Sequence, residues 1–145
     1  MPMSDLRRPI LPARLLFEEG DVARSSQFME AVVAAYVIVA QADGEVASAE
    51  RRKLMSLARH DPLLAAFSRN DIAEELAIHE ANYELDNEVA SEIAAEKLEP
   101  MHKHPREAKA IVEAARAAIP ADGIAHPAEF RALAKVKHIL RVLKD

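Results

Sequence analysis

Two segments of the sequence repeat a pattern of residues that could hold a metal ion. Each segment has an aspartate, a glycine directly after it and a glutamate seven positions after the aspartate. They are Asp43, Gly44 and Glu50 in the first segment and Asp122, Gly123 and Glu129 in the second. The chain contains only three glycines, so composition alone does not explain why two of them follow an aspartate in the same context.

The glycine explains how the two carboxylates of one segment can come together. Glycine readily takes the left-handed conformation that turns a chain out of a helix, so the aspartate before it lies at a bend. The glutamate then falls in the first turn of the next helix. Two such hairpins related by a pseudo-twofold axis would gather four carboxylates, and a divalent cation would relieve their mutual repulsion. Calcium or magnesium suits this all-oxygen set better than zinc, and the predicted metal ligands are Asp43, Glu50, Asp122 and Glu129.

The two segments belong to a longer internal repeat. When the sequence is shifted by 79 positions, residues 31–54 align with residues 110–133 and ten positions are identical. The spacing also matches the second half of an EF-hand calcium loop, but neither copy has the first two ligands of such a loop. Their places hold Val39 and Gln41 in one copy and Ala118 and Pro120 in the other. A second interpretation stays open, because a helix-ending glycine and a glutamate favoured by the helix dipole would give the same residues without a metal.

Helices are the elements that must position these residues. Alanine, glutamate, leucine and basic residues dominate, and apolar residues recur at helical spacing. We predict an all-α, compact single-domain bundle with an internal helix–turn–helix repeat, in which residues 1–24 form a partly ordered N-terminal arm and residues 25–145 the helical domain. The expected helices run from a cap at Ser25 or Ser26 to about Ala42, over 48–60, over a short turn at 63–67, from a cap at Asn70 or Asp71 to Leu98, from Pro105 to Ile119, and from Pro127 onward.

Apolar side chains at helical spacing indicate which side of each helix faces the core. The first helix would use Phe28, Val32, Val33, Tyr36, Val39 and Ala40, and the second Leu54, Met55, Leu57 and Ala58. The long helix before Pro100 would use Ile72, Leu76, Ile78, His79, Tyr83 and Leu85, continuing without a break into Val89, Ile93, Ala94 and Leu98. The last helix would turn inward Phe130, Leu133, Val136, Ile139, Leu140 and Leu143.

Charge is distributed unevenly along the chain, whose net charge is −5. Residues 71–99 carry ten acidic side chains against Lys97 alone, whereas residues 100–145 have an excess of four positive charges. A nucleic-acid interface needs a positive groove and usually stacking aromatics, so this acidic middle argues against a nucleic-acid partner. The acidic segment is most often a solvated helix face, but its charge could supply extra ligands or attract a basic partner.

Composition also indicates the cellular location of the protein and whether it spans a membrane. The absence of cysteine excludes disulfides, thiolate zinc sites and cysteine nucleophiles. The strongest apolar run, residues 31–40, has about half the length that a membrane-spanning helix needs, so we expect a core helix and no direct membrane span. The N-terminal residues lack the cleavage site of a secretory signal. We therefore expect a cytoplasmic protein.

The first Asp-Gly segment resembles the motif of the TerB-like tellurite-resistance family, A-x-A-D-G-x-[ILV]-x-x-x-E. Residues 40–50 read AQADGEVASAE, and residues 118–129 are a looser copy that keeps Asp122, Gly123 and Glu129. The resemblance covers about residues 26–143. It implies an all-α fold of about seven helices, an acidic cluster that binds a divalent metal, a role in resistance to tellurite and related stresses, and no catalysis. It also implies action as a metal-sensing or scaffolding part of a membrane-associated complex with a protein partner.

Other groups of residues are weaker candidates for a metal or catalytic site. His102 and His104 lie between two prolines and could bind a transition metal, but a solvated loop is the simpler interpretation because a third ligand is missing. Glu99 and His102 have the spacing of di-iron helices, which Pro100 interrupts. The sequence has no nucleophile elbow and no glycine-rich phosphate loop, so we predict that the protein is not an enzyme.

Three functions therefore compete at the level of sequence. The favoured one is a divalent-metal-binding acidic helical module in tellurite or chemical-stress resistance. The alternative is a metal-independent helical adaptor for protein–protein interaction, in which the repeated segments are only turns. A metal-assisted hydrolase ranks last, because the sequence offers no general base beyond the carboxylates themselves.

Overall fold

The computed structural model describes residues 22–42, 48–60, 64–119 and 127–142. Six α-helices and one 3-10 helix follow one another in these residues, and they contain no strand. They are α2 (Val22–Ala40), α3 (Ser48–His60), α4 (Arg69–Leu85), α5 (Asn87–Leu98), η3 (Glu99–Lys103), α6 (Pro105–Arg116) and α7 (Pro127–Leu140). The predicted all-α bundle is confirmed. The predicted arm at 1–24 lies almost entirely outside the described residues.

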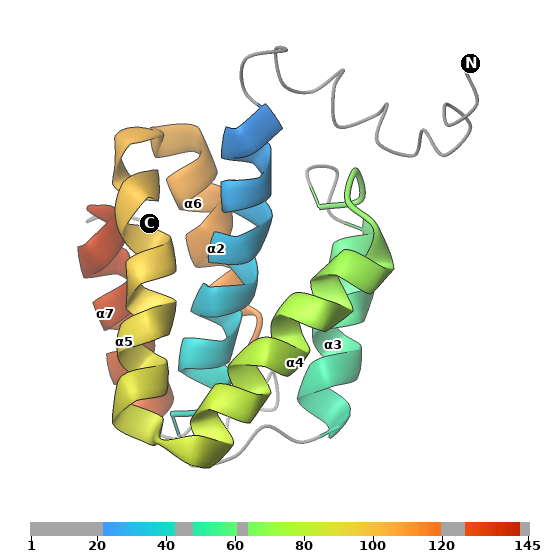
Figure 1. Ribbon diagram of the computed structural model, residues 1–145. Coiled ribbons are helices and arrows are strands. Elements are labelled where there is room, and N and C mark those ends of the chain that lie inside the picture. The colour runs from blue at the N-terminus through green and yellow to red at the C-terminus, as the bar shows by residue number, and fades with distance from the viewer. Residues whose placement is uncertain (1–21, 43–47, 61–63, 120–126, 143–145) are drawn as a thin grey trace.

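Helix α2 is the centre of the bundle. Figure 1 shows it in blue to cyan between α5 and α4 and next to α6, and it also contacts α7 and η3. Every residue from Ala31 to Ala40 is buried, because a helix that is apolar on all sides can only be stable when other elements cover it all round. The inward side chains predicted for this helix are therefore confirmed. Neither α2 nor any other described helix is both long enough and apolar enough to cross a membrane.

The helices have directions that bring four helix ends to the same end of the bundle (Figure 1). Helices α2 and α6 pack side by side and both run downward in that view, while α3 and α7 run upward. Contacts between side chains agree with these directions. Lys97 near the end of α5 reaches Glu30 in the first half of α2, and Arg51 at the start of α3 reaches Glu80 in the second half of α4.

The start of α2 differs from the prediction. The helix begins at Val22, so the expected N-cap residues Ser25 and Ser26 lie inside its first turns. Alanine and arginine, which occupy positions 23 and 24, have high helix propensity and allow the helix to extend upstream. In contrast, α3 covers the predicted residues 48–60, and α6 and α7 begin at Pro105 and Pro127 as expected.

The predicted long helix over residues 70–98 is wrong, because the chain turns at Asp86 between α4 and α5. Asp86 has an extended backbone, and its side-chain Oδ1 accepts a hydrogen bond from Val89 N at 3.0 Å, which caps α5. The cap of α4 is Ser68 rather than Asn70 or Asp71, since its Oγ accepts from both of their backbone N–H groups.

Four side chains that were predicted to face inward are exposed. One residue turns a helix by about 100°, so Ile78 is off the buried stripe that passes through the neighbouring His79. Phe130 is off the stripe that passes through Glu129 in the same way. The exposed residues are Ile78, Leu85, Val89 and Phe130.

The segment between the two prolines at 100 and 105 is ordered. Residues 99–103 form η3, so the loop predicted around His102 is largely a 3-10 helix. His102 Nε2 lies 3.7 Å from Glu99 Oε2, an i,i+3 contact that Pro100 does not prevent. Glu99 Oε2 also lies 3.8 Å from Arg141 Nη1, which connects the start of η3 to the residue after α7.

Helix α7 ends in a Schellman motif. Arg141 has a φ of 58°, and the N–H of Val142 donates to Lys137 O at 2.9 Å while the N–H of Arg141 donates to His138 O at 3.1 Å. These two bonds satisfy the last carbonyls of the helix. The left-handed residue is usually glycine in this motif, and here arginine takes it while its guanidinium group donates to Ile139 O.

The cap at Asp86 gives a test of the corner between α4 and α5. Asp86→Ala should lower the free energy of unfolding by about 1 kcal/mol, because the N–H of Val89 loses its side-chain acceptor. Asp86→Asn should retain most of the stability, since asparagine caps equally well. Urea denaturation measures the difference, with Glu84→Ala as a matched control at an exposed position outside the cap. If Asp86→Asn lowered the free energy of unfolding as much as Asp86→Ala, the capping role would be contradicted.

Candidate functional site

The predicted metal ligands belong to two segments whose flanking helices have ends toward the same end of the bundle. The carboxyl ends of α2 and α6 and the amino ends of α3 and α7 all lie toward the lower end of the bundle in Figure 1. Helices α3 and α7 start 79 positions apart (127 − 48), which is also the offset between the two Asp-Gly segments. In each segment a downward helix is therefore followed by an upward one, while α3 packs mainly on α4 and stands apart from α7.

Glu129 is the best-described of the four predicted ligands. It is the third residue of α7, and only 4% of it is exposed. The buried stripe of α7 consists of Glu129, Leu133, Val136 and Leu140. The helix thus buries a carboxylate at the start of its core side and leaves the adjacent Phe130 exposed, the reverse of the order that hydrophobicity favours.

Glu50 occupies the equivalent place in α3. It is the third residue of that helix and lies four positions before the buried Leu54, as Glu129 lies four positions before the buried Leu133. Its side chain lies outside the described part of the structure. The predicted ligands Asp43 and Asp122 also lie outside it. The convergence of all four carboxylates therefore stays a prediction.

The donor chemistry of this end of the bundle fits a hard divalent cation. The four predicted side chains offer oxygen atoms, which calcium and magnesium prefer. A buried carboxylate such as that of Glu129 is expensive unless other groups satisfy it, and it forms contacts in the structure. Among the described residues no group of three or more acidic or histidine side chains is suited to a metal, and of the four predicted ligands only Glu129 has its side chain in that part of the chain.

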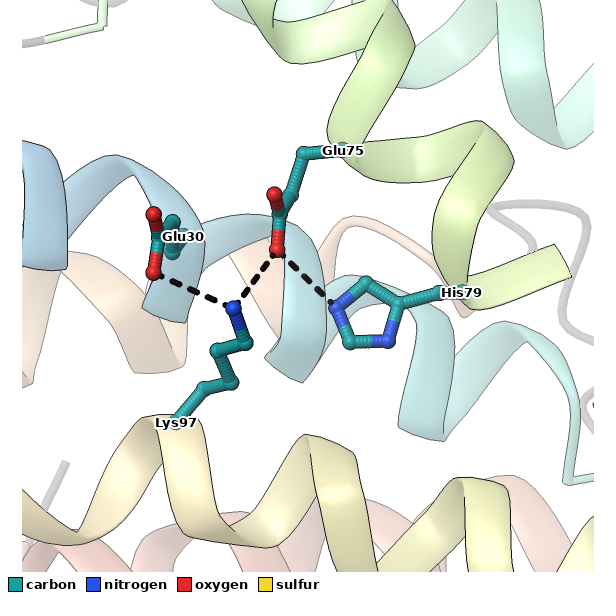
Figure 2. A network of polar contacts seen from close by, with 4 residues as sticks. All are labelled: Glu30, Glu75, His79 and Lys97. Atoms are coloured by element: carbon teal, nitrogen blue, oxygen red, sulfur yellow. Dashed lines mark hydrogen bonds and ion pairs between the residues drawn. The ribbon is translucent and has the colours of Figure 1, made fainter. Parts of the chain in front are cut away.

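A second polar cluster, which the sequence did not predict, connects three helices. Figure 2 shows Lys97 of α5 between Glu30 of α2 and Glu75 of α4, with His79 of α4 on the far side of Glu75. Lys97 Nζ lies 3.1 Å from Glu30 Oε1 and 3.2 Å from Glu75 Oε2. His79 Nε2 lies 3.4 Å from the same Oε2 atom. We call these four residues the Lys97 cluster.

The inner half of the Lys97 cluster is buried and incompletely hydrogen-bonded. His79 is 1% exposed and Glu75 is 8% exposed. The contacts of Glu75 Oε2 have the distances of ion pairs but not the angles of hydrogen bonds, so this atom and both ring nitrogens of His79 lack a hydrogen-bond partner among the described residues. An unsatisfied buried polar atom costs free energy, so Glu75 contributes through its ion pair with Lys97, whereas Lys97 also donates a hydrogen bond to Glu30 Oε1.

Burial and neighbouring charges shift the pKa values in this cluster. Burial lowers the pKa of His79 below 6.5, and Lys97 lowers it further, while the contact with Glu75 opposes both effects. Burial also acts to lower the pKa of Lys97, but the contacts with Glu30 and Glu75 outweigh it and raise that pKa above 10.5. Near pH 7 the cluster therefore contains a neutral imidazole and a charged ammonium group.

The sequence carried one indication of this cluster. Glu75 and His79 are four positions apart on the apolar side of α4, a spacing that places side chains next to each other on a helix. The partners on other helices could not be found in the same way, because Glu30 and Lys97 are 67 positions apart and only the packing of α2 against α5 brings them together.

Removal of the ammonium group should destabilise the fold. In Lys97→Met the carboxylates of Glu30 and Glu75 lose the cation between them, and we expect the free energy of unfolding at pH 7 to fall by about 1–3 kcal/mol, less than for a fully buried pair because Lys97 and Glu30 are partly solvated. Adding Glu75→Gln to this variant should recover part of the loss. Urea denaturation measures the free energy of unfolding of both variants, with Lys135→Met at an exposed position as the control. An equal loss of unfolding free energy in Lys97→Met and Lys135→Met would contradict the prediction.

The pH dependence of stability should report on His79. A histidine whose pKa is lower in the folded state contributes stability that is fully present above 6.5, its ordinary value, and is lost as pH falls through the folded-state pKa. Between pH 7.5 and 5, His79→Gln should therefore flatten the fall in the free energy of unfolding. The exposed His138→Gln serves as the control, and an unchanged slope in His79→Gln would show that another group causes the fall.

Comparison with known proteins identifies the family. The family model of tellurite resistance protein TerB matches residues 29–145, most of the 145-residue chain. A search of curated proteins and a search of solved structures each found no match. The matched region starts within α2 and contains both Asp-Gly segments, the Lys97 cluster and all later helices. The resemblance seen in the sequence is thereby confirmed, and the chain belongs to the TerB family of tellurite resistance proteins.

Proposed function

We propose that this TerB-family domain binds a divalent cation, calcium or magnesium, through Asp43, Glu50, Asp122 and Glu129. In this proposal it serves resistance to tellurite and chemical stress by metal sensing or scaffolding rather than by catalysis. It acts in the cytoplasm on a protein partner that belongs to a membrane-associated complex. Membership of the TerB family supports the link to tellurite resistance.

The observation that carries the proposal is the burial of Glu129 at the end of the bundle where the two hairpins turn. Helix α7 keeps this carboxylate on its buried side and exposes the phenyl ring beside it. A helix that needed only packing would gain more by the opposite arrangement, because burial of a phenyl ring is favourable and burial of a carboxylate is costly. A functional demand on Glu129 explains this choice.

The helix ends supply an electrostatic setting for a cation and its ligands. The amino ends of α3 and α7 favour the negative charges of Glu50 and Glu129 in their first turns. The carboxyl ends of α2 and α6 carry partial negative charge and favour a cation nearby. When bound, the cation would neutralise the carboxylates, and the four side chains would link the two hairpins.

The metal-independent adaptor remains the second candidate, and one observation favours it. The outer side of α4 and the start of α5 expose three large apolar side chains, Ile78, Leu85 and Val89. Exposed apolar groups that lie near one another often mark a binding surface for a protein partner. In this alternative the Asp-Gly segments serve only as turns, and the domain needs no metal to bind its partner.

A titration with divalent cations distinguishes the two candidates. A cation that binds only the folded state stabilises it, by about 2.7 kcal/mol when its free concentration is 100 times its Kd. Under the metal proposal, millimolar calcium or magnesium raises the melting temperature of the domain, measured by circular dichroism or calorimetry. Under the adaptor alternative, neither ion changes it.

Substitutions show which residues cause the cation-induced rise in melting temperature. Glu129→Gln and Asp43→Asn should each abolish most of the cation-induced shift, because each removes one charged ligand of the proposed set. Glu88→Gln on the exposed side of α5 makes the same change of charge and should leave the shift intact. If Glu88→Gln reduced the shift as much as Glu129→Gln, the cation would be binding to general acidic surface and the proposed site would be wrong.

A further inference from the structure

The outer surface of α4 and α5 combines exposed apolar and acidic side chains. Of its large apolar residues, Ile78 is 55%, Leu85 is 86% and Val89 is 49% exposed. Helical spacing puts Glu74, Ile78 and Leu85 on one side of α4, and Val89 and Glu92 on one side of α5. We call the side chains of Glu74, Ile78, Leu85, Glu88, Val89 and Glu92 the acidic–apolar face.

The carboxylates of this face are not engaged in ion pairs within the described part of the chain. Among the described residues, Glu74, Glu88 and Glu92 form no ion pair, nor do the neighbouring Glu84 and Glu96. Lys97, the only basic residue between positions 71 and 99, is engaged with Glu30 and Glu75. A partner that fits this face must therefore bring both positive charge and apolar side chains.

The chain itself contains a segment with that composition. Residues 7–17 read RRPILPARLLF, which has three arginines, no acidic residue and five large apolar side chains. This segment precedes α2, whose first residue is Val22. No other stretch of the sequence outside the described residues has a comparable combination of basic and large apolar side chains.

The length of chain before α2 is sufficient for the segment to reach the face. Phe17 lies five positions and Arg7 fifteen positions before Val22, so in an extended chain they can lie up to about 17 Å and about 50 Å from the start of α2. Helix α2, which is 19 residues long, measures about 28 Å, so the first half of the segment can reach the far end of the bundle. A tethered segment is also present at an effective concentration of order millimolar, which favours it over a partner from solution.

We propose that residues 7–17 dock on the acidic–apolar face of the same chain. Arg7, Arg8 and Arg14 meet the unpaired carboxylates, and the apolar side chains of the segment cover Ile78, Leu85 and Val89. The face is then occupied until a partner of similar basic and apolar chemistry competes for it. This inference is independent of the proposed cation site, which lies on other residues.

Paramagnetic labelling of the full-length chain tests the proposal directly. The protein has no cysteine, so Ala13→Cys introduces a single attachment point for a nitroxide label. In the labelled, ¹⁵N-enriched protein, the amide signals of α4 and the first half of α5 should lose intensity relative to the reduced label, while those of α6 and α7 should not. Because the Debye length falls to about 3 Å at 1 M salt, high salt should restore part of that intensity.

Matched variants separate specific docking from a general charge effect. Arg7→Glu, Arg8→Glu and Arg14→Glu together should restore the signals of α4 and α5, and Leu85→Ser should restore them in part. The triple change Lys103→Glu, Arg106→Glu and Lys109→Glu alters the charge equally at exposed positions of η3 and α6, and should leave the intensity loss in place. Equal restoration by this control would overturn the proposal.

Three further results would also overturn it. A loss of intensity that is uniform over the domain would mean that the segment has no preferred site, and a loss confined to α6 and α7 would place the segment elsewhere. The third result is a loss of signal intensity that arises between molecules rather than within one. It is detected when nitroxide-labelled protein without ¹⁵N is mixed with unlabelled protein that carries ¹⁵N. That last outcome would assign the face to a second copy of the chain.

Discussion

Helix α2 has no side that tolerates water, and the arrangement of the other helices follows from this constraint. Ten consecutive residues from Ala31 to Ala40 are buried, so neighbours must surround the helix rather than cover one side of it. Helices α4, α5, α6 and α7 all contact it. The Lys97 cluster then ties α2 to α4 and α5 by charge. The carboxyl ends of α2 and α6 and the amino ends of α3 and α7 lie toward the lower end of the bundle in Figure 1.

Sequence patterns predicted the elements whose ends carry strong local preferences. Proline at the first helical position located the starts of α6 and α7, and the apolar run of α2 predicted a core helix. The break at Asp86 was missed, because a continuous helical pattern of apolar residues passes through it and an aspartate cap competes with helix continuation only weakly. The same miss led to the wrong prediction that Leu85 and Val89 face the core.

The residues of the candidate site could be named from the sequence, but their burial and packing could not. The repeated spacing of Asp, Gly and Glu is sufficient to name four residues, and one of them, Glu129, is a buried carboxylate in the first turn of α7. Its burial could not be read from the sequence, where the adjacent Phe130 was the natural choice for the core. The Lys97 cluster was beyond prediction for another reason, since its charges come from three helices and only tertiary packing unites them.

The central position of α2 also has a consequence for the dynamics of the domain. Its backbone amides can reach solvent only when the surrounding helices separate, which amounts to unfolding of the whole bundle. Helix α3, by contrast, packs mainly on α4 at the periphery, and Leu54 and Ala58 anchor it in the core. Amide exchange in α2 therefore reports the stability of the whole bundle, whereas exchange in α3 needs the separation of fewer neighbours.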